Sequence, residues 1–165
     1  MDEEIDIVDE LGNILYSISK IEAHKKGLLH KTVIAEVIDS KGNIYLVKQS
    51  SDRQDAGQYV SPVGGHVKKG ETEEEALVRE VLEEIGLTDF EYELLGREIF
   101  NREVLGRIEN HFFIVFKITT DKEFILGDEA DDFEKFNKEQ LIKEVMINPK
   151  KFGNVFHFVF EKFYK

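Results

Sequence analysis

Hydrophobic and polar residues alternate along the first third of the chain in the manner of β-strands. Residues 4–8 alternate and residues 9–13 have the composition of a turn. Residues 32–38 and 44–48 are β-type runs on either side of a turn-forming segment, and together they predict a hairpin. Residues 14–24 fit a strand and a helix equally. A loop rich in glycine follows, around Gly57, Gly64 and Gly65.

The periodicity changes at residues 72–85, where it predicts an amphipathic helix. Thr72 and Glu75 have the spacing of a capping box, and Gly86 stands where a helix ends. A rotation of 100° per residue gathers the apolar positions into one stripe, which we expect to face the core. That stripe consists of Leu77, Val78, Val81, Leu82 and Ile85.

Strand patterns return after this helix, and the chain closes with two more helices. Residues 90–95, 98–104 and 112–118 are rich in aromatic and β-branched residues, whereas residues 138–146 and 153–164 have a helical period. This order predicts an α+β fold with a mixed β-sheet between helical layers. We expect one domain over residues 1–165, because a domain typically has roughly 150 residues.

Composition narrows the classes of function. The chain has 22 basic and 34 acidic residues and a net charge of −12, which argues against a nucleic-acid polymer or an anionic membrane as its main partner. No apolar run approaches the ~20 residues of a membrane helix, and the acidic start does not resemble a secretory signal. Cysteine is absent, which excludes a thiol nucleophile and fits a reducing compartment. We therefore expect a cytoplasmic protein that acts on small molecules.

The predicted helix at residues 72–85 carries a cluster of carboxylates beside its apolar stripe. Glu73, Glu80, Glu83 and Glu84 fall within an arc of about 100°, where like charges at i and i+4 repel each other. Magnesium is the natural counter-ion, because it is held by one or two carboxylates together with substrate phosphates. The glycines before the helix let the backbone approach an ion or a phosphate, so the segment predicts a metal-phosphate site.

A glutamate-rich helix in isolation is usually a solvated surface helix, but the spacing here argues otherwise. Residues 65–87 match the Nudix box, G-x5-E-x7-R-E-U-x-E-E-x-G-U with U a bulky apolar residue, at every specified position. The chain therefore resembles the Nudix superfamily. The matches are Gly65, Glu71, Arg79, Glu80, Val81, Glu83, Glu84, Gly86 and Leu87.

The resemblance implies a Nudix-type α/β/α sandwich and a hydrolase for nucleoside diphosphates linked to another moiety, with Mg²⁺ or Mn²⁺ as cofactor. It implies that Glu80, Glu83 and Glu84 bind metal and that Glu80 activates water. In the same way, Gly64 supplies a carbonyl ligand, whereas Gly65, Glu71 and Arg79 support the site. An acidic loop at residues 128–134 supplies one more carboxylate in related enzymes, with Glu129 favoured and Glu134 as the alternative. Many Nudix proteins are dimers, which makes a homodimer one expectation.

A second resemblance, outside the box, is to type I isopentenyl-diphosphate isomerase, with residues 1–30 as an N-terminal strand and extension. His24, His30 and His66 lie in segments similar to the metal-histidine segments of the isomerase. Singly, each histidine also fits a surface, packing or loop-shaping role. The isomerase needs a catalytic cysteine, whose matching position here is Gly64. Hydrolysis is therefore favoured, with isomerisation and non-catalytic nucleotide binding as alternatives.

An anionic substrate needs local cations on a chain of this charge. Lys48 and Arg53 lie at about the positions where the isomerase-like branch presents basic residues to a diphosphate, and we expect them to bind substrate. Further basic candidates are Lys68, Lys69, Arg97, Arg102 and Arg107. Tyr59, Phe100 and Phe112 have the chemistry to stack on a base, although core packing is the usual role of such residues.

Overall fold

The computed structural model describes residues 3–50, 57–104, 107–128 and 130–164. The strands are β1 (Glu4–Val8), β2 (Ile14–Ser19), β3 (His30–Ile38), β4 (Ile44–Gln49), β5 (Tyr59–Val60), β6 (Val63–His66), β7 (Glu91–Val104), β8 (Arg107–Thr119) and β9 (Ala130–Phe136). The helices are α1 (Lys20–Lys26), α2 (Glu73–Ile85), α3 (Lys138–Ile147) and α4 (Asn154–Phe163), with a short 3-10 turn at Pro149–Lys151. No helix among these residues is both long and apolar enough to cross a membrane.

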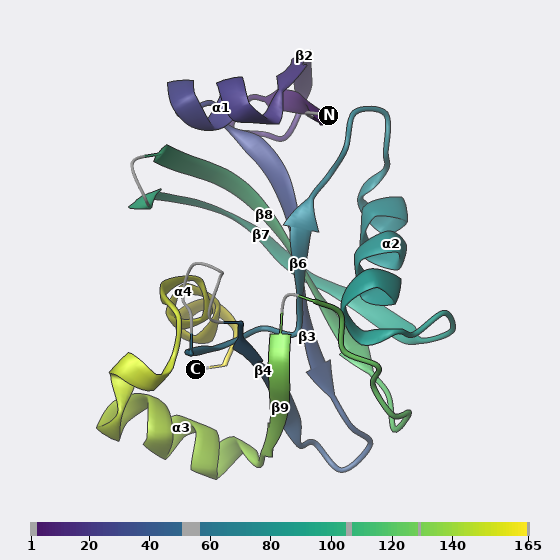
Figure 1. Ribbon diagram of the computed structural model, residues 1–165, viewed down its shortest axis with the longest axis vertical. Helices are drawn as coiled ribbons and strands as arrows, with labels where there is room; N and C mark the ends of the chain where they lie inside the picture. Colours follow the sequence, from purple (N-terminus) through teal and green to yellow (C-terminus); the bar gives the residue numbers. More distant parts are fainter. Residues whose placement is uncertain (1–2, 51–56, 105–106, 129, 165) are drawn as a thin grey trace.

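Strand β3 organises a single mixed sheet that contains all nine described strands (Figure 1). It pairs in parallel with β8 from His30 opposite His111 to Ile38 opposite Thr119. It pairs antiparallel with β1, β4 and β6, so that β6 and β8 both lie against β3. The predicted α+β fold with a mixed sheet between helices is confirmed.

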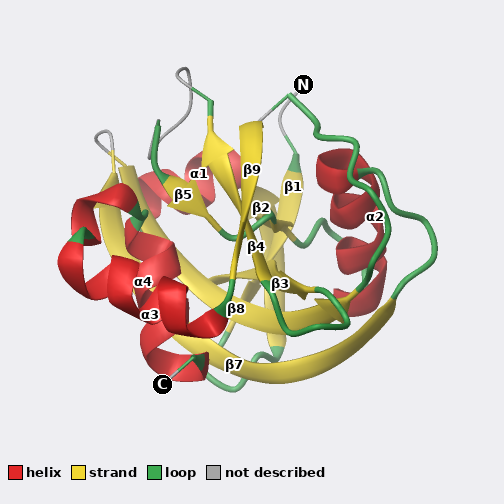
Figure 2. Ribbon diagram, turned by 90° about the horizontal axis from the view of Figure 1, so that it is seen from below, coloured by secondary structure: helices red, strands yellow, loops and turns green. Residues whose placement is uncertain are grey.

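Alternation along β3 divides the core between two helical layers. Val33, Ala35 and Val37 pack with α2 on one face of the sheet, whereas Ile34 packs with α3 and α4 on the other. Figure 2 shows α2 on one side of the curved sheet and the other two helices on the opposite side. A smaller cluster joins α1 to β1 at the N-terminal end of the fold.

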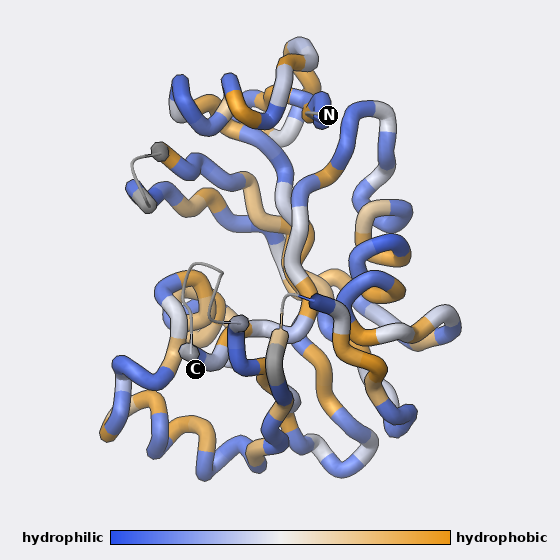
Figure 3. Tube along the Cα trace, viewed as in Figure 1, coloured by the Kyte–Doolittle hydropathy of each residue, from blue (hydrophilic) through white to orange (hydrophobic). Residues whose placement is uncertain are grey.

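Helix α2 begins and ends as predicted, but its buried face is displaced from the predicted stripe. The capping box of Thr72 and Glu75 forms, and Gly86 ends the helix in the left-handed conformation at φ 71°. Figure 3 shows the mixture of hydrophobic and hydrophilic positions along this helix. Leu77, Val81 and Ile85 are buried as expected, together with Ala76 and Glu80.

The prediction that Val78 and Leu82 face the core is wrong, because their exposed fractions are 46% and 52%. Ala76 and Glu80 lie about 200° away from Val78 and Leu82 around the helix axis, so the buried arc turns toward the carboxylates. The buried face of α2 therefore includes part of the acidic arc, which was predicted to lie beside that face. Glu80 ends up within the buried face.

Other helices and strands differ from the prediction where strand pairing outweighs the local hydrophobic pattern. Residues 14–24 form a strand and then a helix, with Ser19 as the N-cap of α1. Residues 90–95 and 98–104, predicted as two strands, belong to the single strand β7, whose register shifts between Leu94 and Gly96. The glycine-rich loop contains the unpredicted strands β5 and β6, and β9 was also unpredicted.

Glu36 is a buried carboxylate on the face of β3 that packs against α4. Only 1% of it is exposed, and it accepts a short hydrogen bond from Ser61 and one of 2.7 Å from the Tyr164 hydroxyl. Burial raises the pKa of the Glu36 carboxyl, although both hydroxyl contacts oppose this shift. This carboxylate links the C-terminal helix to the segment that precedes β6.

We expect Glu36 to make the protein less stable as the pH rises. The unfolded carboxyl ionises near its ordinary pKa of 4.5, whereas the folded one keeps its proton to higher pH. The folded state therefore binds more protons above that pH, and the free energy of unfolding falls as pH increases. Glu36→Gln keeps the two hydrogen bonds and removes the ionisation. Urea unfolding at pH 5 and pH 8 should show the variant gaining stability relative to wild type at pH 8.

The exposed Glu139→Gln on α3 is the matched control and should show no such difference between the two pH values. An equal effect of Glu36→Gln at both pH values would show that Glu36 titrates normally in the fold.

Candidate active site

One cleft, of about 1000 Å³, runs along the sheet beside β6 and is lined by carboxylates, histidines and basic side chains. Helix α2 contributes Glu80, Glu83 and Glu84 to its lining. Histidines from α1, β6 and β8 also line it, so two groups of metal-binding side chain share one cleft.

The carboxylates of α2 reach the cleft because glycine leaves room for them. A Cβ atom on Gly65 would lie 2.2 Å from the carboxyl carbon of Glu80, so a side chain there would displace that carboxylate. The neighbouring Gly64 donates its backbone N–H to Glu84 over 2.7 Å. The structure thus brings Gly64 and the three predicted carboxylates together. Carboxylates and backbone carbonyls are the hard oxygen ligands that magnesium takes.

Arg79 links the loop before α2 to the carboxylates of the helix. Its guanidinium donates two hydrogen bonds to Glu71, of 2.8 and 2.9 Å, and one of 2.5 Å to Glu80. It lies 3.6 Å from the Glu83 carboxylate. The hydrogen bonds from Arg79 lower the pKa of the Glu71 carboxyl, and those to Glu71 raise the pKa of the guanidinium. Glu73, the fourth member of the acidic arc, pairs instead with Arg97 and Lys31.

Strand β6 separates the carboxylates from the histidines. Successive residues of a strand point to opposite faces, so Gly65 faces α2 and His66 faces the other side of the sheet. His66 lies opposite Thr32 on β3, and His111 on β8 lies opposite His30 on the other side of the same strand. Helix α1 places His24 over these three strands.

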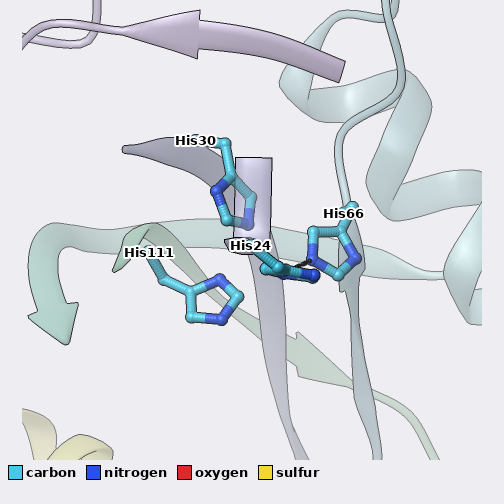
Figure 4. Close-up of side chains that lie close together, drawn as sticks. All are labelled: His24, His30, His66 and His111. Atoms are coloured by element: carbon cyan, nitrogen blue, oxygen red, sulfur yellow. Dashed lines mark hydrogen bonds between the residues drawn. The ribbon is translucent and has the colours of Figure 1, made fainter. Parts of the chain in front are cut away.

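His24, His30, His66 and His111, here called the histidine tetrad, converge on one point (Figure 4). One ring nitrogen from each lies within 4.8 Å of those of the other three. Their ring centroids are between 4.8 and 6.2 Å apart. All are buried except His66, which is half-buried.

The hydrogen bonds of the tetrad leave a nitrogen lone pair directed at its centre. His30 Nδ1 lies 2.8 Å from the Leu28 carbonyl, which only accepts hydrogen bonds, so Nδ1 carries the proton. Its Nε2 is then an acceptor, and it is buried without a hydrogen-bond partner in the described structure. A buried acceptor without a donor is costly unless a cation binds it. A histidine that donates Nδ1–H to a carbonyl is also the usual state of a metal ligand.

Burial keeps two of the four imidazoles, those of His30 and His66, neutral. Burial, reinforced by His111, lowers the pKa of His30 to about 3, and burial together with the other histidines lowers that of His66 well below its ordinary value. The neutral imidazole is the form that binds metal, and a group of four histidine nitrogens suits zinc, copper, iron or nickel better than magnesium. The tetrad therefore fits a transition-metal ion.

Outer contacts orient His111 within the tetrad. Its Nδ1 lies 2.6 Å from the Thr32 hydroxyl, and its Nε2 lies 3.4 Å from Glu109. Glu109 is itself paired with Arg102 at 3.2 Å. Sequence reasoning named three members of the tetrad and missed His111. The signal for it was the parallel pairing of β3 and β8, which places His111 beside His30.

Two other predicted site residues, Lys48 and Glu134, do not line the cleft, and two more lie outside the described residues. Val47 and Gln49 line the cleft, and Lys48 between them points to the opposite face of β4. Glu134 is half-buried beside Tyr59, whose pKa is raised by burial and by that carboxylate. Arg53 and Glu129 lie outside the described residues, although Asp128 and Ala130 beside Glu129 line the cleft.

Lys68 and Arg102, two of the further basic candidates, line the cleft. Lys20, Phe113 and Phe156 also line it, and these three were not predicted. The three aromatic residues named from the sequence pack into the core instead. Phe112 belongs to the cluster beneath α2, whereas Tyr59 and Phe100 pack against the cluster beneath α3 and α4.

Comparisons with known proteins identify the family and the fold. Residues 28–156 match the model of the NUDIX domain family. The chain is 33% identical over 140 residues to isopentenyl-diphosphate Delta-isomerase 2 of Photorhabdus laumondii, an alignment that covers 83% of this chain and 78% of the relative. Protein DR0079 of Deinococcus radiodurans has a similar fold, with a TM-score of 0.77, 20% identity and coverage of 97% and 99%. The MutT protein of Methanosarcina mazei Go1 has a TM-score of 0.64 at 25% identity, covering 81% of this chain and 91% of that one.

Proposed function

The chain belongs to the Nudix family, and we propose that it is a Mg²⁺-dependent hydrolase that cleaves the diphosphate linkage of a small nucleotide-type substrate. The observation that carries this proposal is that Glu80, Glu83 and Glu84 line one cleft, with Glu80 against Gly65 and Glu84 bonded to Gly64. A diphosphate is the ligand that such a site suits, because magnesium bridges carboxylates to phosphate oxygens.

The residues of the cleft have separate tasks in this proposal. Glu80, Glu83, Glu84 and the carbonyl of Gly64 would hold magnesium, which would neutralise diphosphate charge and make water a better nucleophile. Glu80 accepts the proton of the attacking water, whose oxygen bonds to one phosphorus as the bridging P–O bond breaks. The departing phosphate group takes up a proton from solvent. Arg79 keeps the Glu80 carboxylate in place for this step.

The remaining walls of the cleft accommodate the rest of the substrate. Lys20, Lys68 and Arg102 supply positive charge near the anionic groups. Ile34, Val47, Phe113, Val155 and Phe156 form an apolar wall for the other moiety. We also propose that the histidine tetrad holds a transition-metal ion, whose fixed positive charge would favour anions in the same cleft.

A substrate panel tests the hydrolase proposal. Purified protein with Mg²⁺ is incubated with nucleoside di- and triphosphates, nucleotide sugars and dinucleotides, and release of phosphate or nucleoside monophosphate is measured. We expect turnover of at least one class, with loss of turnover in EDTA and recovery when Mg²⁺ is restored. Binding of these compounds without any release of product would instead support a non-catalytic module.

The second candidate function is isomerisation of isopentenyl diphosphate, which the histidine tetrad and the isomerase relative favour. Against it stands the absence of cysteine, since Gly64 occupies the position that matches the isomerase thiol. Adding isopentenyl diphosphate to the panel separates the two. Conversion to dimethylallyl diphosphate without hydrolysis would replace the hydrolase proposal.

A further inference from the structure

The histidine tetrad and the α2 carboxylates lie on opposite faces of β6, yet the Arg79 side chain forms hydrogen bonds with a residue of each group. Arg79 donates a hydrogen bond of 2.9 Å to the backbone carbonyl of His66, in addition to its bonds to Glu71 and Glu80. Only β3 pairs with β6 among the described strands, so the other edge of β6 is open to this guanidinium. Arg79 thus closes the edge of the strand from which His66 projects.

A hydrogen bond that holds the His66 carbonyl also restrains the His66 side chain. The peptide group and the Cα–Cβ bond of a strand residue move together, so a bond to the His66 carbonyl restrains the direction of its ring. His66 Nε2 lies 3.2 Å from His24 Nε2, and the His66 ring centroid lies 5.0 Å from that of His30. A displacement of the His66 ring would therefore disturb both contacts.

Arginine is required for this link because of its shape. A planar guanidinium has five N–H donors in fixed directions, and here they serve Glu71, Glu80 and His66 at once. A lysine at this position would supply one compact charge and three donors from a single nitrogen. It cannot span a bidentate carboxylate, a second carboxylate and a strand-edge carbonyl together.

We propose that Arg79 is a positioning residue shared by both metal centres, and that it holds His66 in the tetrad as well as Glu80 in the carboxylate site. The proposal rests on the proposed metal binding at the tetrad. Its consequence is that changing Arg79, which is no ligand, weakens metal binding on the far face of β6. Partners that orient a ligand in this way typically contribute about 10- to 100-fold to metal affinity.

Cobalt binding tests this proposal without using activity. The metal-free protein is titrated with Co²⁺ while excess Mg²⁺ occupies the carboxylates, and the visible absorption of nitrogen-bound cobalt is followed. We expect Arg79→Lys to weaken Co²⁺ binding by about tenfold or more. Arg97→Lys is the matched control, because Arg97 also pairs with a glutamate of α2 but makes no hydrogen bond to β6 in the described part of the chain. It should change the affinity less than twofold.

Folding is checked by circular dichroism, and Glu71→Gln provides a second variant that weakens the anchor of Arg79 while keeping arginine in place. It should also weaken Co²⁺ binding. Equal affinity in wild type, Arg79→Lys and Glu71→Gln would overturn the shared role and leave the tetrad as a metal site. No Co²⁺ binding by wild type would overturn both the tetrad assignment and this inference, whereas the substrate panel reports on hydrolysis separately.

Discussion

Glu83→Gln is expected to lower kcat/KM for the hydrolysed substrate by about 10²- to 10⁴-fold, the range that one positioned catalytic group contributes. The variant replaces a carboxylate of the cleft with a neutral amide of the same size, so Mg²⁺ loses a charged ligand. Hydrolysis rates at saturating Mg²⁺ measure this effect, and calorimetric titration with Mn²⁺ measures the accompanying loss of metal affinity.

The fold should tolerate this change. The Glu83 side chain is 55% exposed and lies 3.6 Å from Arg79, an ion pair that contributes little at such exposure. Removing its charge also relieves repulsion within the acidic arc. We therefore expect the free energy of unfolding to change by no more than about 0.5 kcal/mol.

Glu74→Gln is the matched control, since Glu74 is an exposed residue on the same helix that does not line the cleft. It should retain wild-type turnover. Undiminished hydrolysis by Glu83→Gln would remove Glu83 from the metal site and would require another source of carboxylate ligands.

Local chemistry explains why α2 and its carboxylates were predictable from the sequence. The capping box at Thr72 and the left-handed Gly86 fix the ends of the helix through contacts within a few residues. The spacing of Glu80, Glu83 and Glu84 then fixes their directions around the helix axis. The side of the helix that the sheet covers depends on tertiary packing, which is why Val78 and Leu82 were misplaced.

Non-local pairing explains what the sequence did not show. Gly64 and Gly65 have low strand propensity, and they form β6 because β3 supplies hydrogen-bond partners across Ile34 and Val33. The tetrad requires β3 to meet β6 and β8 in a particular register, and no local pattern specifies that register. His111 was therefore indistinguishable from any other histidine of a strand until the sheet was known.

Substrate-binding residues were the least predictable part of the site. Lys48 was predicted to bind substrate because of its place in the chain. Strand alternation instead directs its neighbours Val47 and Gln49 into the cleft. Lys20 and Arg102 reach the cleft from α1 and β7, which are distant from the Nudix box in the sequence. Arg102 was one of several basic candidates from the sequence, whereas the proposed role of Lys20 follows from the folded arrangement alone.

A metal ion bound at the histidine tetrad should stabilise the folded protein. A ligand that binds only the folded state stabilises it, by about 2.7 kcal/mol at a concentration of 100 times Kd. For a chain of this size, that corresponds to a rise of about 5 to 10 °C in Tm. We expect Zn²⁺ to raise Tm of the metal-free protein by this amount, as measured by circular dichroism, and EDTA to reverse the rise.

His66→Gln should abolish most of this stabilisation, because it removes one of four converging nitrogens from the cleft side of the tetrad. Its Zn²⁺ affinity should fall by more than the roughly 10- to 100-fold that loss of an outer partner costs. His157→Gln is the control, since His157 on α4 contacts the Pro149 carbonyl and lies outside the tetrad. If Zn²⁺ raised Tm equally in all three proteins, the ion would be binding elsewhere, and the buried lone pair of His30 would need a different partner.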